Sequence, residues 1–297
     1  MPRYRVLFTT VVALVSNLAS QAAAQGAGQF YVEATSTPTP FFPAGARNAD
    51  WTPVVREFNG VEMVLVPAGC FEMGSMDGGS DERVVHRVCY EEPFWIDKYE
   101  VTNAQYRACV TAGACSPPYD KTNYDDPAYA DHPVVDVNWF QAGEYAAWMG
   151  GALPTEAQWE YAARGPEGWE YPWGDTFDGT RLNFCDASCE FDGRDSTYDD
   201  GYTQTAPVGS FRKGASWVGA HDMSGNVWEW TSTAYAGYPY QADEVREAGS
   251  RLDARALRSG SWFSAKYYTR ATYRFGAAPN FRGLGIGFRV VRVAPSQ

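Results

Sequence analysis

After Gly165 the chain has little recognisable secondary structure, and this feature most constrains what it can fold into. The segment is punctuated by Gly, Asp and Pro, and only residues 227–231, 256–262 and 287–293 have the composition of short strands. Long irregular segments are uncommon inside a compact domain, because their backbone groups need other anchors. The chain has eleven tryptophans and six cysteines. We therefore expect buried aromatic rings, disulfides and bound ions to hold these loops.

The first half of the chain carries clearer signals of regular structure. Residues 61–69 and 94–101 are apolar runs of strand type. Three helices are expected, over residues 102–110, 139–149 and 153–164. In the last of them Thr155 and Gln158 have the spacing of a capping box. The pattern predicts one large domain over residues 57–297, with long loops and little regular secondary structure.

Residues 1–24 have the features of a cleavable secretory signal. Arg3 and Arg5 precede a largely apolar stretch, and the three alanines at 22–24 supply small residues for cleavage. The apolar stretch is too short for a stable membrane span, and the alternative is a buried N-terminal helix. We expect a secreted or periplasmic protein with no membrane span.

Residues 25–56 are rich in Thr, Pro, Gly and Ala, a composition that predicts a linker without a core of its own. The formal net charge of the chain is −12 at pH 7, and it becomes −14 without residues 1–24, which hold two arginines and no acid. An acidic domain repels phosphate backbones and anionic membranes, so we expect no nucleic-acid partner. The same charge could serve solubility alone.

Six cysteines in an exported chain predict three disulfides. Proximity pairs Cys109 with Cys115 and Cys185 with Cys189, which leaves Cys70 for Cys89. The alternative is a metal site, because a Cys-x3-Cys spacing can present two thiolates on one helical face. Against it, the chain has only three histidines, and they are widely separated: His86, His132 and His221.

Several segments resemble the formylglycine-generating (sulfatase-modifying factor) family. The segment Asp222-Met-Ser-Gly-Asn-Val-Trp-Glu-Trp is one of them, and Leu153-Pro-Thr-Glu-Ala-Gln-Trp-Glu-Tyr is another. The similar segments occur in family order, over residues 63–75, 96–106, 132–139, 153–165, 171–175, 205–210, 222–230 and 285–289. The resemblance implies a compact α+β fold of the formylglycine-generating-enzyme-like type, a single domain with little regular secondary structure. This fold is related to C-type lectins and often holds calcium.

The resemblance also implies two structural calcium sites. The first maps onto Asn183, Phe184, Asp200 and Tyr202, and the second maps onto Asp222, Gly225, Val227 and Glu229. Calcium prefers six to eight hard oxygen ligands, which carboxylates, amides and backbone carbonyls supply. The alternative is that the acidic residues near position 195 only form a solvated loop.

The catalytic chemistry of the family is not carried over. Members that make formylglycine hold copper with two thiolates, and soft thiolates are the ligands that select copper(I). Ser264 stands where the first of these cysteines belongs, and no cysteine follows Cys189. A serine hydroxyl is a poor copper(I) ligand, so we expect no copper. This interpretation would fail if the fold brought Cys185 or Cys189 beside Ser264.

The C-terminal segment instead concentrates residues that dominate binding surfaces. The expected cleft consists of Trp262, Phe263, Ser264, Lys266, Tyr268, Arg270, Tyr273, Arg274 and Arg282, although some of these aromatic residues could belong to the core. The sequence therefore predicts a non-catalytic, secreted domain that binds a peptide, protein or glycan. Two alternatives stay open, a family enzyme with a different oxidative chemistry and a structural component of the cell envelope.

Overall fold

The computed structural model describes residues 41–43, 45–191, 193–240, 250 and 252–294. The expected signal at 1–24 and the first part of the expected linker lie outside these residues. No helix among the described residues is long and apolar enough to cross a membrane.

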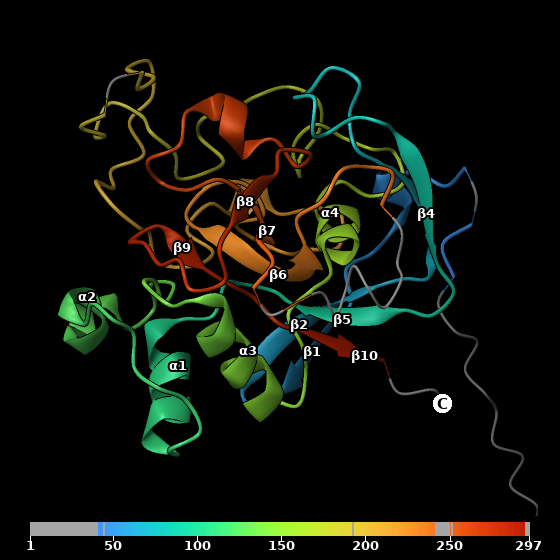
Figure 1. Cartoon of the computed structure of the whole chain (residues 1–297). Coiled ribbons are helices and arrows are strands. Elements are labelled where there is room, and N and C mark those ends of the chain that lie inside the picture. The colour runs from blue at the N-terminus through green and yellow to red at the C-terminus, as the bar shows by residue number, and fades with distance from the viewer. Residues whose placement is uncertain (1–40, 44, 192, 241–249, 251, 295–297) are drawn as a thin grey trace, which may run out of the picture. The chain divides into compact units, whose positions relative to one another are not determined.

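One antiparallel sheet joins the beginning and the end of the domain (Figure 1). Its strands, in spatial order, are β1 (Val55–Phe58), β2 (Val61–Val66), β5 (Phe94–Asp97) and β10 (Val291–Val293). β2 and β5 are the two apolar runs predicted from the sequence, and β5 pairs with both β2 and β10. The C-terminal strand therefore completes a sheet that the first strands begin.

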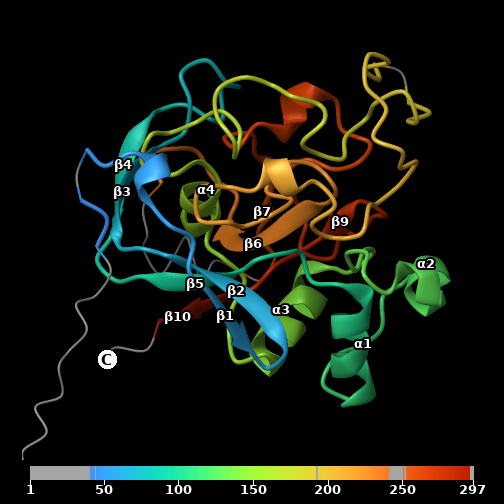
Figure 2. The same cartoon turned by 180° about the vertical axis from the view of Figure 1, so that it is seen from behind.

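A second four-stranded sheet lies at the centre of the irregular C-terminal half, as both views show (Figures 1 and 2). In spatial order it consists of β8 (Phe275–Ala277), β7 (Arg255–Arg258), β6 (Trp228–Ala234) and β9 (Ile286–Gly287). β6 pairs with β7 in antiparallel and with β9 in parallel orientation. A separate hairpin is formed by β3 (Gly69–Met73) and β4 (His86–Tyr90). The three strands expected after Gly165 are thus present, with shifted boundaries and with the last divided into β9 and β10.

The helices are α1 (Asn103–Thr111), α2 (Thr122–Asp125), α3 (Trp139–Trp148) and α4 (Glu156–Arg164). Thr102, Asn138 and Thr155 each accept a hydrogen bond from the backbone of the first turn and so cap α1, α3 and α4. The predicted capping box of Thr155 with Gln158 is present. The expected α+β fold with little regular structure is confirmed.

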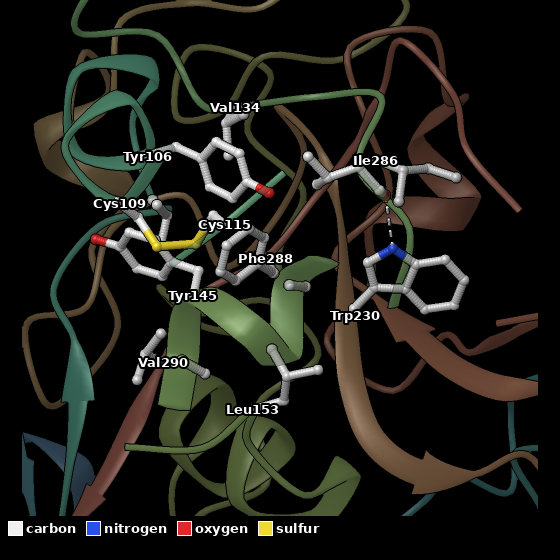
Figure 3. Packing of buried hydrophobic residues seen from close by; sticks show 14 of the residues in the cluster. Tyr106, Cys109, Cys115, Val134, Tyr145, Leu153, Trp230, Ile286, Phe288 and Val290 are labelled. Atoms are coloured by element: carbon white, nitrogen blue, oxygen red, sulfur yellow. Dashed lines mark hydrogen bonds between the residues drawn. A yellow bond between two sulfur atoms is a disulfide. The ribbon is translucent and has the colours of Figure 1, made fainter. Parts of the chain in front are cut away.

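The largest apolar cluster lies where α1 and α3 meet the segment around β9 (Figure 3). Tyr106 and Tyr145 stack with ring centroids 5.7 Å apart, and Phe288 packs edge-on against both. Trp230 is fully buried, and its indole N–H donates to the carbonyl of Val137 at 3.1 Å. Buried aromatic rings therefore hold irregular segments together, as expected.

All three expected disulfides are present, between Cys70 and Cys89, Cys109 and Cys115, and Cys185 and Cys189. They use all six cysteines of the chain, so no thiol is left for a metal.

The expected linker needs a correction over residues 41–56. Phe42 is only 6% exposed and packs against Trp217, with ring centroids 5.2 Å apart. Asn48 is buried, and its amide donates to the carbonyl of Arg164 at 2.9 Å. Alanine, proline and glycine give this segment the composition of a linker, but its aromatic and amide side chains are sufficient to anchor it. The packed domain therefore begins before residue 57.

Candidate functional site

An apolar hollow of about 430 Å³ opens beside the second sheet. Each strand of that sheet contributes one side chain to it, from Trp228 on β6, Leu257 on β7, Phe275 on β8 and Ile286 on β9. The segment between β7 and β9 supplies the remaining lining, which is Phe263, Ser264, Tyr268, Tyr273, Phe281 and Gly283. A sheet thus forms a rigid support, and loops form the rim.

The hollow presents aromatic surface to solvent. Tyr268 is 41% exposed, Phe275 47% and Phe281 49%. None of the described lining residues is a histidine, lysine, arginine or carboxylate. Burial raises the pKa of Tyr273 to about 12, so its phenol keeps its proton at neutral pH. The arrangement can hold an apolar group, but it presents neither a charged group nor a general base.

Ser264 lies at the hollow but is not an activated nucleophile. It is 5% exposed, and its hydroxyl accepts a hydrogen bond from the backbone N–H of Ser261 at 3.0 Å and lies 3.1 Å from the Ser261 hydroxyl. A nucleophilic serine needs a positioned base within hydrogen-bonding distance. Ser261 cannot act as one at neutral pH, so Ser264 reads as a turn residue.

The structure brings Cys185 beside Ser264, so the absence of a cysteine after position 189 does not by itself exclude thiolate chemistry at the hollow. The backbone N–H of Cys185 donates to the carbonyl of Ser264 at 3.0 Å. Cys185 and Cys189 are bonded to each other and are only 2% and 3% exposed. A disulfide offers no thiolate, so these residues do not fit a copper ion in the oxidised protein.

Of the nine residues expected in the cleft, four line the hollow: Phe263, Ser264, Tyr268 and Tyr273. Trp262 stands behind the rim, where its ring packs edge-on against Phe263 at 5.0 Å. Lys266 is exposed and reaches Asp195 at 3.5 Å. Arg282 is exposed and donates to Gln141 at 3.3 Å. These three residues surround the hollow without lining it.

Arg270 and Arg274 were expected to line the cleft, but neither of them lines the hollow. Both are at most 5% exposed. The guanidinium of Arg270 binds both oxygens of Glu82, at 3.0 and 2.7 Å, and that of Arg274 binds both oxygens of Glu156, at 2.7 and 2.6 Å. Because buried ion pairs of this geometry use the donors of arginine, these side chains support the fold and do not recognise a ligand at the hollow.

Sequence reasoning missed five lining residues, namely Trp228, Leu257, Phe281, Gly283 and Ile286, whereas Phe275 belongs to the aromatic C-terminal segment that the sequence indicated. Strand alternation can mark one face of β6 or β7 as apolar. It cannot show which apolar face lies against the core and which lies against an open hollow, so no signal in the sequence separates these residues from core positions.

The first expected calcium site contains one ligand atom without a hydrogen-bond partner. Asn183 is 1% exposed, and its side-chain oxygen is buried without a hydrogen-bond partner among the described residues. The carboxylate of Asp200 accepts hydrogen bonds from the backbone N–H groups of Phe184, at 3.4 Å, and Tyr202, at 2.8 Å. The carbonyl of Tyr202 accepts a hydrogen bond from the Ser188 hydroxyl at 2.6 Å. Burial, together with the neighbouring carboxylate of Asp186, raises the pKa of Asp200 to about 7. A bound hard cation would give the Asn183 side-chain oxygen a partner and would favour the charged form of Asp200.

The second expected site fits less well. Both carboxylate oxygens of Glu229 accept hydrogen bonds from Arg289 at 2.7 Å, and one also accepts from Trp159 at 2.8 Å. The carbonyl of Gly225 accepts a hydrogen bond from the Ser259 hydroxyl at 3.0 Å. Ligands that are already satisfied by protein donors gain little from a metal, so a site built on Glu229 is not supported.

Glu100, which the sequence did not single out, lies at this second position. Its carboxyl group accepts from the Asn226 amide at 2.5 Å and from the Val227 N–H at 3.2 Å. Burial, with the nearby charges of Asp222 and Glu229, raises the pKa of Glu100 well above its ordinary value. No group of three or more His, Cys, Asp or Glu side chains within the described ranges is arranged to hold a metal ion.

Comparison with known proteins identifies the family. A family model described as the sulfatase-modifying factor enzyme 1-like domain matches residues 49–294. The chain belongs to this family. The match begins inside the segment that was expected to be a linker, in agreement with the packing of Asn48 and its neighbours.

Relatives within the sulfatase-modifying factor family differ in activity. The chain is 32% identical to the inactive C-alpha-formylglycine-generating enzyme 2 of Bos taurus, over 77% of this chain and 87% of the relative. It is also 32% identical to the formylglycine-generating enzyme of Streptomyces coelicolor, over 83% of this chain and 94% of that enzyme. The serine/threonine-protein kinase Pkn1 of Chlamydia trachomatis shares 32% identity over 78% of this chain, but the match spans only 38% of that protein.

Among solved structures, PvdO from Pseudomonas aeruginosa is similar with a TM-score of 0.63 and 27% identity, over 82% of this chain and all of PvdO. The expected formylglycine-generating-enzyme-like fold is thereby confirmed. The relative named inactive and the relative named as an active enzyme are both 32% identical to this chain. Family membership therefore does not decide whether this chain is an enzyme, and its own residues must be considered.

Proposed function

We propose that this chain is a secreted, non-catalytic ligand-binding member of the family. Its aromatic hollow would take an apolar side chain of an extracellular or periplasmic peptide or protein. The observation that carries the proposal is an open hollow of about 430 Å³, whose lining is mainly aromatic and, among the residues that the structure describes, contains no charged side chain. Rigid, half-exposed aromatic rings give large contact area at low entropy cost, which is why they dominate binding hot spots.

A glycan is a poorer occupant of the same hollow. Sugars need several hydrogen-bonding groups, and the described side chains of the lining offer three hydroxyls, of Ser264, Tyr268 and Tyr273, and the indole N–H of Trp228. The Ser264 hydroxyl is already engaged by Ser261. This chemistry favours an apolar peptide side chain over a saccharide.

Selection of binders from a displayed peptide library is expected to yield peptides that carry an aromatic or branched apolar residue. Phe281→Ala should weaken the affinity of a selected peptide by about 1–2 kcal/mol, roughly tenfold, because it removes a rim contact. Titration calorimetry with the wild-type protein and the variant measures the difference. Trp148→Ala, which removes a 39% exposed ring on α3, serves as the control and should leave the affinity unchanged. Equal losses in both variants would mean that the peptide binds elsewhere, and binding of glycans alone would contradict the choice of ligand.

A second candidate, an oxidase, is favoured by one observation, the contact between Cys185 and Ser264. Soft-metal chemistry there would require the Cys185–Cys189 disulfide to open, and both residues are buried. We therefore expect that the purified protein, incubated with copper and oxygen, leaves a Cys-x-Pro-x-Arg peptide unchanged. Mass spectrometry of that peptide is the measurement, with a known formylglycine-generating enzyme as the positive control. Conversion of the cysteine to an aldehyde would replace the binding proposal with the enzymatic one.

Calcium at the first site is expected to stabilise the loops around Asn183. A ligand that binds only the native state adds about 2.7 kcal/mol to the free energy of unfolding at a concentration of 100 Kd. Chelation should therefore lower the melting temperature, and added calcium should restore it, as measured by scanning calorimetry.

Two variants separate a calcium site from a solvated acidic loop. Asp200→Asn should abolish the response to calcium, because it removes the charged ligand. Asp199→Asn removes an adjacent exposed carboxylate and should keep the response. Equal responses in both variants, or no response in the wild-type protein, would reject the site.

A further inference from the structure

The three disulfides differ sharply in their exposure to solvent. Cys109 and Cys115 are at most 8% exposed, and Cys185 and Cys189 are at most 3% exposed. In contrast, Cys89 is exposed and Cys70 is half-buried. This third disulfide joins the strands of the β3–β4 hairpin, which both views place away from α1 and α3 (Figures 1 and 2). Of the three bonds, it alone is open to attack without unfolding.

The hairpin has one core-facing side and one solvent-facing side. Cys70 lies opposite Cys89, and Glu72 lies opposite Arg87. Because side chains two residues apart share a face of a strand, these four residues stand together on one side. The exposed or half-buried positions of all four show that this side faces solvent. Phe71 points to the other side and is buried.

A cavity of about 450 Å³ adjoins the disulfide, and Cys70 lines it. Two guanidinium groups, from Arg47 and Arg87, and two carboxylates, from Glu72 and Glu167, also line the cavity. Cationic and anionic side chains therefore line the same cavity, so a ligand with both a carboxylate and an ammonium group can pair with each kind. The volume suits a small molecule.

We propose that Cys70–Cys89 is a thiol–disulfide exchange site for a zwitterionic low-molecular-weight thiol that binds in this cavity. The thiolate of the ligand attacks Cys70 Sγ, because Cys70 is the cysteine that lines the cavity. A mixed disulfide forms between the ligand and Cys70, the Cys70–Cys89 bond breaks, and Cys89 leaves as a thiolate. The ligand sulfur and Cys70 share the new bond, and the electron pair of the broken bond stays on Cys89. A second thiol would release Cys70 and complete the two-electron reduction.

Arg87 assists the leaving group. It lies two residues before Cys89 on the same face of β4, and a nearby cation stabilises a thiolate. Exchange is faster when the leaving thiolate is more stable and the attacked sulfur is accessible. The same hairpin therefore supplies the accessible sulfur, the cation for the leaving group and part of the ligand cavity.

The test treats the folded full chain with cysteine, which is a zwitterionic thiol, or with 2-mercaptoethanol, which is uncharged. Alkylation then stops the reaction, and mass spectrometry maps each cysteine. We expect Cys70–Cys89 to open on the order of tenfold faster than the two buried disulfides. With limiting cysteine, the mixed disulfide should lie on Cys70 and the alkyl group on Cys89. In urea all three bonds should open at comparable rates.

Arg87→Gln tests the recognition step, with Arg56→Gln, a change of another exposed arginine, as the control. Arg87→Gln should slow the reaction with cysteine severalfold more than the reaction with 2-mercaptoethanol, and Arg56→Gln should slow neither. Opening of a buried disulfide at the same rate, or a mixed disulfide on Cys89, would overturn the exchange site. An equal effect of Arg87→Gln on both thiols would overturn the zwitterionic ligand.

Discussion

Replacing Arg274 by methionine is expected to lower the free energy of unfolding by about 3–5 kcal/mol, the usual cost of removing one partner of a buried ion pair. The guanidinium of Arg274 binds both oxygens of Glu156 at 2.6 and 2.7 Å, and both side chains are fully buried. Methionine fills much of the same volume but leaves Glu156 with Arg258 as its remaining ion-pair partner in this cluster. Urea unfolding followed by tryptophan fluorescence measures the loss.

The loss should be specific to the buried pair. Arg212→Met changes an exposed arginine and should alter stability by no more than about 0.5 kcal/mol. Arg274→Lys keeps the charge but not the paired donors, so its stability should lie between those of the wild-type protein and Arg274→Met. If Arg274→Met unfolded like the wild-type protein but lost peptide binding, Arg274 would be a ligand-binding residue after all.

Arg274 also shows why the sequence led to the wrong assignment of two arginines to the binding cleft. The sequence presents Arg270 and Arg274 beside several tyrosines, a composition shared by binding surfaces and by buried ion-pair clusters. What decides between them lies far away in the chain. Glu82 precedes Arg270 by 188 residues, and Glu156 precedes Arg274 by 118. No local pattern carries that information.

The features that the sequence predicted well are local in origin. The capping box of Thr155 with Gln158 needs only one helical turn, and the Cys109 and Cys185 pairings close short loops. The order of the family segments then supplied the fold, which the family match over residues 49–294 confirms. The N-terminal boundary was placed wrongly because composition averages over a segment. Phe42 and Asn48 anchor that segment individually, although most of its residues are typical of a linker.

The contact between Cys185 and Ser264 illustrates the same limit at the candidate site. The sequence shows that no cysteine follows position 189, but not that the loop around Cys185 folds back on the hollow. The non-catalytic proposal therefore rests on the closed disulfide and on the hydrogen bonds of Ser264, not on distance. The proposal depends on whether Cys185 is held in a disulfide or is a free thiol. The copper experiment and the exchange experiment both examine this state.

Gly225→Ala is expected to lower the free energy of unfolding by about 2–5 kcal/mol, the sum of a strained backbone and overpacking. Gly225 has a φ of +83°, which L-residues rarely adopt. A methyl group there would lie 2.1 Å from the carbonyl oxygen of Asn183, so the backbone itself would have to move. That carbonyl also accepts a hydrogen bond from the N–H of Asn226 at 2.8 Å. Thermal unfolding measures the loss.

Gly143→Ala is the matched control, because Gly143 lies within α3 and nothing lies within 4 Å of the added methyl group. Alanine is favoured over glycine inside a helix, so this variant should gain about 1 kcal/mol. If Gly225→Ala lowers the free energy of unfolding and Gly143→Ala raises it, the loss comes from the close approach of Gly225 to Asn183. It would not be a general effect of replacing glycine. If Gly225→Ala were as stable as the wild-type protein, the loops at positions 183 and 225 would not need the close packing seen here. The first calcium site, which depends on the position of Asn183, would then lose its structural support.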